Sequence, residues 1–459
     1  MSETIAAISS APGEGAIGVV RISGDRAKEI LGRLFCPAGS DFEERKFYYG
    51  TIQEPSSNCV IDEVLAVYMA APRTYTREDV AEIYCHGSYL SVKRILEAVL
   101  FCGAVPAEPG EFTKRAFLNG RIDLAQADAV IDVIRARTDL AHTAAVGQLG
   151  GRLSERIRAI RSVLADALAE TVVHLDYPDE DEDPASDNSA AVRIAKMLEG
   201  AAEEIRELVE TAEAGRMVCD GLNVVIAGKP NVGKSSLLNA LLRETRAIVS
   251  DVPGTTRDRI EEYANVHGIP VKFVDTAGIR DAEGEVEQIG IDMALDATRD
   301  ADIILFLVDG SGGIDDYDKK VAARLGGKTA VTLVSKSDAY QVINLTDAEA
   351  LIPGSPVMSV SSVSGAGIAE LEKHIAELVF GGEISPGERL LVTNARHKNL
   401  LVRALAETEK AAGELRSGAP LDFAEVEMRA AYDSLGEIIG ETVTDDILDR
   451  VFERFCVGK

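Results

Sequence analysis

Tryptophan is absent from this 459-residue chain, aromatic residues make up only 5% of it, and no apolar run approaches the length of a membrane span. The longest strongly apolar segment, residues 303–308, has the length of one buried strand. The stretch MSETIAAISS carries an acid and no basic region, so we expect no signal peptide. We therefore expect a cytoplasmic globular protein, with room for about three domains.

Paired cysteines are also missing. The six cysteines are far apart and form no C-x-x-C motif, so neither a disulfide framework nor a zinc site is indicated. Cys85 and His86 are adjacent, but without a second ligand pair ordinary structural roles are the better interpretation.

The sequence lacks the basic stretches that nucleic-acid-binding proteins usually carry, and its formal net charge is −28. Its most marked charge run is acidic, DYPDEDEDPASD over residues 176–187, which indicates a solvated loop between helices. If the protein acts on RNA, we expect another molecule to supply most of the phosphate contacts.

Periodicity divides the chain into a multidomain α/β protein. Residues 1–118 mix strand-like runs with one helical stretch, which is typical of an α+β domain. Residues 119–216 and 383–459 are predicted to be two parts of one helical domain, because each has an amphipathic face that needs a partner. Residues 217–382 alternate buried strands with helices, which indicates a doubly wound parallel sheet inserted between those parts.

The motif GKPNVGKS occupies residues 228–235, after the strand-like LNVVIA and before the helical SLLNALL. That context is the one a phosphate-binding P-loop requires. Backbone amides of the loop would hold phosphates, Lys234 would bridge the β- and γ-phosphates, and Ser235 would hold Mg²⁺.

Further markers of a Ras-like GTPase follow in order along the chain. The segment DVPGTTRD offers Thr255 and Thr256 as a switch threonine for Mg²⁺, and DTAG, residues 275–278, ends a strand. The segment SKSD ends another strand and offers Asp338 to the hydrogen-bond donors of a guanine base, which adenine lacks. Together these motifs resemble those of the translation-factor class of GTPases.

Two positions depart from that pattern. Ser335 stands where the class usually has asparagine, so we expect guanine selectivity with weaker affinity. Ile279 follows DTAG, where Ras-like enzymes place the glutamine that orients the attacking water. We therefore expect either a very slow GTPase or another group in that role.

The chain ends in FCVGK, residues 455–459, for which three readings are open from the residues alone. Chain ends are usually poorly ordered. A prenylation box is disfavoured, because Gly458 is not aliphatic and Lys459 is not a usual final residue. The third reading is that the tail folds back into a site.

With the P-loop, GTTRD, GAIGVVRISG, GEFTKRAFLNGRIDLAQADA and the terminal CVGK in place, the whole sequence resembles the MnmE (TrmE) family of tRNA-modification GTPases. The resemblance implies an N-terminal domain similar to tetrahydrofolate-binding domains that forms a homodimer, and a G domain inserted in a helical domain. It also implies a flavin- and NADH-using partner, MnmG (GidA). With that partner, the family adds a carboxymethylaminomethyl or aminomethyl group at C5 of the wobble uridine (U34) of certain tRNAs, using a one-carbon unit from 5-formyl- or 5,10-methylene-tetrahydrofolate.

The resemblance also implies how GTP is hydrolysed without the glutamine. A K⁺ ion would be held by Asn231, Ser250, Val252 and Thr255, and Mg²⁺ by Ser235 and Thr256. Glu287 would orient the water, and Lys234 would stabilise the transferred phosphoryl group. The residues expected to bind GTP are Asn231, Val232, Gly233, Lys234, Ser235, Ser236, Ser250, Asp251, Val252, Pro253, Gly254, Thr255, Thr256, Asp275, Thr276, Ala277, Gly278, Ser335, Lys336 and Asp338.

For the tail, the resemblance implies a folate pocket formed by Arg21, Glu82, Arg121 and Lys459. Paired cations and an acid suit the glutamate carboxylates and the pterin edge of a folate. Cys456 would be either a catalytic thiol or part of the pocket wall.

Two other function classes compete with a GTPase that drives tRNA modification. One is a ribosome-assembly GTPase of the Era or EngA kind, but those proteins generally carry basic RNA-binding modules, which this acidic chain lacks. The other is a non-catalytic folate- or nucleotide-sensing scaffold, which multiple-turnover GTP hydrolysis would exclude.

Overall fold

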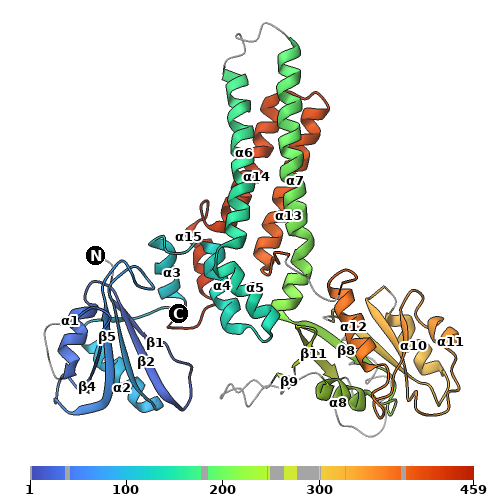
Figure 1. The fold of residues 1–459 in the computed structure, drawn as a ribbon, viewed down its shortest axis with the longest axis horizontal. Helices are drawn as coiled ribbons and strands as arrows, with labels where there is room; N and C mark the ends of the chain where they lie inside the picture. Colours follow the sequence, from blue (N-terminus) through green and yellow to red (C-terminus); the bar gives the residue numbers. More distant parts are fainter. Residues whose placement is uncertain are drawn as a thin grey trace.

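The computed structural model describes residues 3–36, 42–176, 184–244, 247–248, 263–275, 299, 301–325, 327–383 and 389–458. These residues form two separate seven-stranded sheets and an elongated helical bundle (Figure 1). The predicted fold class, an N-terminal α+β domain, a helical domain and an inserted P-loop domain, is confirmed.

The N-terminal domain is built on one sheet with the strand order β3-β4-β5-β6-β2-β1-β7. Its strands are β1 (Ile5–Ile8), β2 (Gly15–Ser23), β3 (Phe35–Cys36), β4 (Phe47–Gln53), β5 (Val60–Met69), β6 (Val80–Gly87) and β7 (Val105–Pro106). Helices α1 (Ala27–Leu34) and α2 (Tyr89–Phe101) pack against the sheet, and alternate strand residues such as Val20, Ile22 and Ile83 form the core with them. The strand-like runs GAIGVVRIS and VLAVYMA lie in β2 and β5, and the helical stretch SVKRILEAVL lies in α2.

The side-chain alternation leaves other strand residues exposed. Phe47, Tyr49 and Leu65 are exposed large hydrophobic residues, while their chain neighbours Tyr48 and Ala66 belong to the core. Register places Tyr49 opposite Leu65, and Leu65 opposite Tyr84. An apolar strip therefore crosses β4, β5 and β6.

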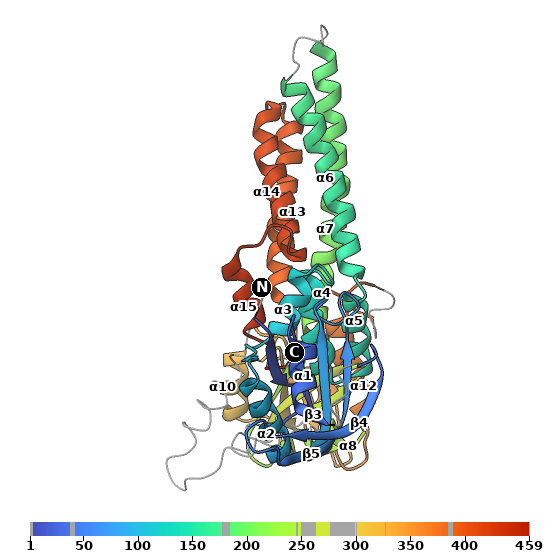
Figure 2. The same ribbon diagram turned by 90° about the vertical axis from the view of Figure 1, so that its left-hand side faces the viewer.

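The helical domain contains a bundle of four long helices drawn from both flanks of the inserted domain. These are α6 (Arg152–Asp176), α7 (Pro184–Asp220), α13 (Ala395–Arg416) and α14 (Leu421–Ile439). Figures 1 and 2 show them running side by side, and one core joins Ile194, Leu198 and Ile205 to Leu401 and Leu435. The prediction that the two flanks bury each other's apolar faces is confirmed.

Shorter helices connect the bundle to the rest of the molecule. They are α3 (Glu111–Leu118), α4 (Leu124–Arg135), α5 (Asp139–Leu149) and α15 (Asp445–Phe452). Asp123 caps α4, because its side chain accepts from the Gln126 amide while the Gln126 side chain accepts from the Asp123 amide. On the apolar face of α4, Leu124 and Ala127 are buried, whereas Ile134, in the last turn of the helix, is exposed.

The inserted domain holds the second sheet, with the order β14-β13-β12-β8-β11-β10-β9. The predicted parallel strands are present as β8 (Leu222–Ala227), β11 (Ile269–Asp275), β12 (Ile303–Asp309), β13 (Ala330–Ser335) and β14 (Val357–Ser359). Two strands that the sequence patterns did not indicate, β9 (Ala247–Ile248) and β10 (Tyr263–Val266), add an antiparallel edge. The helices are α8 (Lys234–Glu244), α10 (Asp316–Leu325), α11 (Leu345–Glu349) and α12 (Ile368–Val379).

The C-terminal tail returns to the N-terminal domain. Val457 forms a β-bridge with Pro109, the Gly110 amide donates to the Cys456 carbonyl at 3.4 Å, and the Ser9 hydroxyl donates to the Gly458 carbonyl at 3.0 Å. A Cβ atom on Gly458, whose φ is +95°, would lie 2.1 Å from the Ile8 carbonyl oxygen. Of the three readings of the tail, the described part, residues 455–458, therefore follows the one in which it folds back.

Among the described residues, none of the helices is both long enough and apolar enough to span a membrane.

Candidate nucleotide site and N-terminal pocket

The P-loop connects β8 to α8, as its sequence context predicts. Gly228, with φ +148°, passes so close to β12 that a Cβ atom would lie 2.5 Å from the Leu307 carbonyl oxygen. Asn231 and Gly233 also have positive φ values, +64° and +102°. The loop therefore takes a tight path that only particular residues permit.

Lys234 begins α8 and is only 7% exposed. Its ammonium group donates to the carbonyls of Gly228 and Lys229, both at 2.8 Å. The loop thus curls around this cation at the N-terminus of α8, where backbone amides and the helix dipole favour anions. Ser235 and Ser236 follow in the first turn of the same helix.

Ser335 ends β13 and is almost completely buried. Its hydroxyl donates toward the P-loop carbonyl of Val232 at 2.8 Å and lies 3.1 Å from the Val308 carbonyl. The serine that replaces the usual asparagine therefore still links this strand end to the P-loop.

Asp338 is exposed in the loop that follows β13, and its carboxylate accepts a hydrogen bond from the Ser361 hydroxyl at 2.6 Å. That hydrogen bond lowers the pKa of Asp338, so the group is held as a carboxylate acceptor. Sequence reasoning missed Ser361. The signal available for it was its position just after a short strand, since the carboxyl ends of parallel strands line one edge of a sheet.

Lys336 lies between Ser335 and Asp338 in the sequence and has a φ of +57°. Its ammonium group donates to Asp309 at the end of β12 at 2.7 Å. Burial raises the pKa of Asp309, but hydrogen bonds from Lys336 and Ser311 outweigh it, so the pKa is below its usual value.

Much of the predicted nucleotide site lies outside the described residues. These predictions are Ser250, Asp251, Val252, Pro253, Gly254, Thr255, Thr256, Thr276, Ala277, Gly278 and Glu287. Asp275 ends β11, with its backbone opposite Ile226 of β8, so it belongs to the same sheet edge as the P-loop.

In the N-terminal domain, Arg21 of β2 lies directly opposite Glu82 of β6. The Arg21 Nε donates to Glu82 Oε1 at 2.8 Å, and the Tyr84 hydroxyl donates to Glu82 Oε2 at 2.5 Å. Glu82 is 9% exposed. The burial of Tyr84, together with the hydrogen bond to Glu82 and the charge of Glu82, raises the pKa of Tyr84 to about 12. Two neighbours thus fix the orientation of this carboxylate.

Tyr75 joins the third predicted folate residue to the pair. The guanidinium carbons of Arg21 and Arg121 lie 5.7 and 4.6 Å from the centre of its ring, and Arg121 donates to the Tyr75 carbonyl at 3.1 Å. The Tyr75 hydroxyl is 2.9 Å from that of Thr113. The structure therefore brings Arg21, Glu82 and Arg121 together around an aromatic ring that sequence reasoning missed.

The tail lies beside this cluster. Gly458 contacts Ile8, and the next strand residue, Ala7, is paired with Arg21. Gly110, which donates to the Cys456 carbonyl, lies two positions before Phe112, and the Phe112 ring centre is 5.7 Å from the Arg21 guanidinium carbon. Cys456 is exposed, and Lys459 lies outside the described residues.

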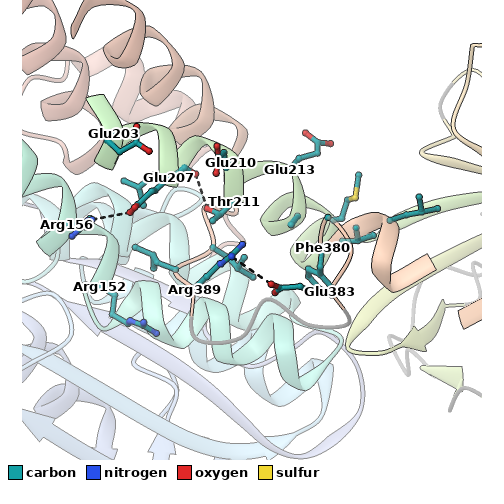
Figure 3. Close-up of a pocket in the computed structure, with 18 of the residues that line it drawn as sticks. Arg152, Arg156, Glu203, Glu207, Glu210, Thr211, Glu213, Phe380, Glu383 and Arg389 are labelled. Atoms are coloured by element: carbon teal, nitrogen blue, oxygen red, sulfur yellow. Dashed lines mark hydrogen bonds and ion pairs between the residues drawn. The ribbon is translucent and has the colours of Figure 1, made fainter. Parts of the chain in front are cut away.

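A separate groove of about 1020 Å³ lies where α6 and α7 meet the end of α12 (Figure 3). Arg152, Arg156 and Arg389 face several glutamates there, with Arg156 paired to Glu207 and Arg389 to Glu383. None of the predicted site residues lines this groove.

The mostly parallel sheet and the P-loop between β8 and α8 define a nucleotide-binding protein of the P-loop class. The model of the GTP-binding protein TrmE N-terminus matches residues 4–121, and that of the MnmE helical domain matches residues 124–456. The chain belongs to the MnmE family.

Relatives match along the whole length. The chain is 46% identical over 463 residues to "tRNA modification GTPase MnmE" of Alkaliphilus oremlandii, with 100% of both chains covered. It is 47% identical over 461 residues to the protein of the same name from Geobacillus kaustophilus, with 100% of this chain and 99% of the relative covered.

Solved structures match in part. Aquifex aeolicus Era bound to GDP.AlF4- is 26% identical, with 40% of this chain and 66% of that chain covered and a TM-score of 0.26. The G domain of T. maritima FeoB is 27% identical, with 34% of this chain and 97% of that chain covered and a TM-score of 0.25.

Proposed function

We propose that the chain is a GTP hydrolase that acts in a tRNA-modifying complex. The observation that supports this most directly is the P-loop folded around Lys234, with the carboxylate of Asp338 held ready by Ser361 at the same sheet edge. Membership of the MnmE family supports the link to tRNA.

Hydrolysis would depend on Mg²⁺ and K⁺. Ser235 and Thr256 would hold Mg²⁺, and Asn231 with Ser250, Val252 and Thr255 would hold K⁺. The described P-loop fits an anionic ligand, because an almost buried cation and a helix N-terminus converge there. When bound, the cations would neutralise charge that develops in phosphoryl transfer.

In the reaction itself, Lys234 would bind the β- and γ-phosphates, and Glu287 would position the attacking water, since Ile279 cannot. GTP hydrolysis should then be much faster in potassium than in sodium salts. Equal rates in the two salts would remove the potassium site from this proposal.

We propose that Arg21, Glu82, Arg121, Lys459 and the tail bind a tetrahydrofolate that donates a one-carbon unit. The fit is chemical: two guanidinium groups suit the glutamate carboxylates, and an oriented carboxylate suits the pterin edge. Cys456 would serve there as a nucleophile or as part of the wall.

The modification would be a carboxymethylaminomethyl or aminomethyl group at C5 of the wobble uridine (U34), made together with MnmG (GidA). A net charge of −28 favours tRNA contacts made mainly through that partner. The protein would work in the cytoplasm.

A homodimer formed through the N-terminal domain would cover exposed apolar surface. The strip formed by Phe47, Tyr49 and Leu65 is of the kind that isolated soluble domains rarely leave open. We also propose domain boundaries after residues 118, 216 and 382, with the G domain at residues 217–382.

The folate proposal is tested by calorimetric titration of the purified protein with 5-formyltetrahydrofolate, beside a variant that lacks residues 456–459. We expect binding by the intact chain and its loss in the truncated one, while GTP binding is retained in both. No binding by the intact chain would contradict the folate site and leave the GTPase proposal standing.

A further inference from the structure

The second residue of the P-loop, Lys229, makes contacts that its place in the motif does not explain. Its ammonium group lies 3.0 Å from Asp315 Oδ2, 3.1 Å from Asp318 Oδ2 and 3.5 Å from the Gly313 carbonyl. The side chain is 19% exposed. These contacts tie the P-loop to the segment that leads into α10.

The two carboxylates form a preorganised acceptor. The Asp318 amide donates to Asp315 Oδ1 at 3.0 Å, and the Asp315 amide donates to Asp318 Oδ2 at 3.2 Å, so the two residues cap α10 reciprocally. Asp318 is completely buried, and its Oδ1 has no hydrogen-bond partner among the described residues. A buried carboxylate is costly without a cation beside it, and Lys229 is the cation that reaches it.

The main chain of Lys229 serves the phosphate side of the loop. Its carbonyl accepts a hydrogen bond from Lys234, the lysine placed at the phosphates, at 2.8 Å. One residue therefore connects α10, through its side chain, to the phosphate-binding lysine, through its backbone.

The segment between β12 and α10, residues 309–318, contacts both Lys229 and the predicted base-recognition loop, residues 335–338. It starts at Asp309, which accepts from Lys336 at 2.7 Å, and it ends at the Asp315–Asp318 pair. The phosphate loop and the base loop are thus attached to opposite ends of one short connection between β12 and α10.

We propose that Lys229 is a positioning residue for guanine-nucleotide binding, which sets the P-loop against the base-recognition loop by its ion pairs with Asp315 and Asp318. The proposal rests on the GTP-binding function proposed above. A binding site whose two halves are fixed in advance loses less entropy when the nucleotide binds.

The test measures binding of a fluorescent GDP analogue and steady-state GTP hydrolysis for Lys229→Met, Lys229→Arg and a control, Lys319→Met. Lys319 lies on α10 and is well exposed, and its replacement by Met removes the same charge as Lys229→Met. For Lys229→Met we expect a five- to twentyfold rise in Kd and in KM for GTP, with a smaller fall in kcat. Lys229→Arg should restore most of the affinity, and Lys319→Met should bind within about twofold of the unaltered protein.

A second variant, Asp315→Asn, separates positioning from simple charge attraction. If Lys229 acted only as a free cation near the phosphates, removal of an acidic partner would tighten nucleotide binding. The proposal predicts weaker binding, because the anchor is loosened.

Normal affinity in Lys229→Met, equal loss in Lys319→Met, or tighter binding in Asp315→Asn would each overturn the proposal. These results differ from failure of the proposed function, in which the unaltered protein itself would neither bind nor hydrolyse guanine nucleotides.

Discussion

At the scale of single residues, the proposed nucleotide site keeps its internal contacts despite a changed motif. Ser335 replaces asparagine, yet its hydroxyl still reaches the P-loop carbonyl of Val232. Asp338, the residue that we propose reads guanine, presents a carboxylate that accepts a hydrogen bond from Ser361. We therefore place base selection on Asp338.

Asp338→Asn should reverse that selection. An amide can donate to the 2-oxo group of xanthine, whereas the carboxylate accepts from the amino group of guanine, so we expect at least a tenfold shift in affinity from GTP toward xanthosine triphosphate. Competition binding with the two nucleotides measures the shift. An unchanged preference would mean that the base is read by another residue.

Several contacts at the two sites join residues that are far apart in the sequence, and these contacts were not predicted. Ser361 meets Asp338 across 23 positions, Arg121 meets Tyr75 across 46, and Lys229 meets Asp318 across 89. Such contacts come from tertiary packing and leave no local spacing to read. Lys234 and Asp338 were predictable because the phosphate and base loops depend on a short contiguous string.

At the scale of elements, the parallel strands and the long helices were predictable, but the antiparallel edge strands β9 and β10 were not. Four of the five parallel strands, β8, β11, β12 and β13, are largely buried apolar runs, whereas β14 is short and partly exposed. The bundle helices show clear apolar faces. β9 and β10 have only two and four residues; β10 pairs with β11 and β9 pairs with β10, so their pairing depends on these neighbours rather than on a pattern of their own.

Helices α4 and α5 bind residues 391–393, where the chain leaves the inserted domain. Thr393 donates to Asp132 of α4 at 3.0 Å, and Gln148 of α5 donates to the Leu391 carbonyl at 2.8 Å. Burial raises the pKa of Asp132 to about 6, with the charges of Asp128 and Asp220 adding to it while the Thr393 hydrogen bond opposes it. This junction therefore contains a titratable group in the range near neutral pH.

The sign of its pH effect follows from the raised pKa. The folded state binds the Asp132 proton more tightly than the unfolded state. The stability that this group contributes is therefore fully present at low pH and is lost as pH rises through about 6. A shift of about two pH units corresponds to at most about 3 kcal/mol, and solvent contact reduces it to about 1–2 kcal/mol.

Asp132→Asn should remove the pH-dependent contribution of this carboxyl group to the stability of the protein. Its thermal midpoint should rise relative to the unaltered protein at pH 8 but change little at pH 4, whereas the control Asp166→Asn, on an exposed position of α6, should show no such difference. Calorimetric scans at both pH values measure it. Parallel pH profiles for Asp132→Asn and the unaltered chain would contradict the assignment.

The tail is the element on which the folate proposal depends. Gly458→Ala should displace it, because the new methyl group would overlap the Ile8 carbonyl oxygen at 2.1 Å. We expect 5-formyltetrahydrofolate affinity to fall at least tenfold, with GTP hydrolysis little changed.

The matched control is Gly418→Ala. Gly418 also has a positive φ, +79°, but a Cβ atom there meets nothing within 4 Å. Equal folate affinity in Gly458→Ala and in this control would show that the packing of the tail does not shape the pocket.

At the scale of the whole molecule, the two proposed sites belong to separate sheets joined by the helical domain (Figure 1). The C-terminal half of that domain ends in the tail beside Arg21, and its N-terminal half leads through α7 into β8 and the P-loop. Figure 1 shows both sheets near the same end of the long bundle, so the helical domain connects the proposed nucleotide site to the proposed folate site.

The most direct test of the account is the nucleoside composition of tRNA. The chain would be expressed with its own MnmG partner in a bacterial strain that lacks both genes, and wobble nucleosides would be measured by mass spectrometry. We predict that carboxymethylaminomethyl- or aminomethyl-uridine appears with the unaltered chain and is absent with Lys234→Ala. Unmodified wobble uridine, from a chain that hydrolyses GTP normally in the same strain, would contradict the account.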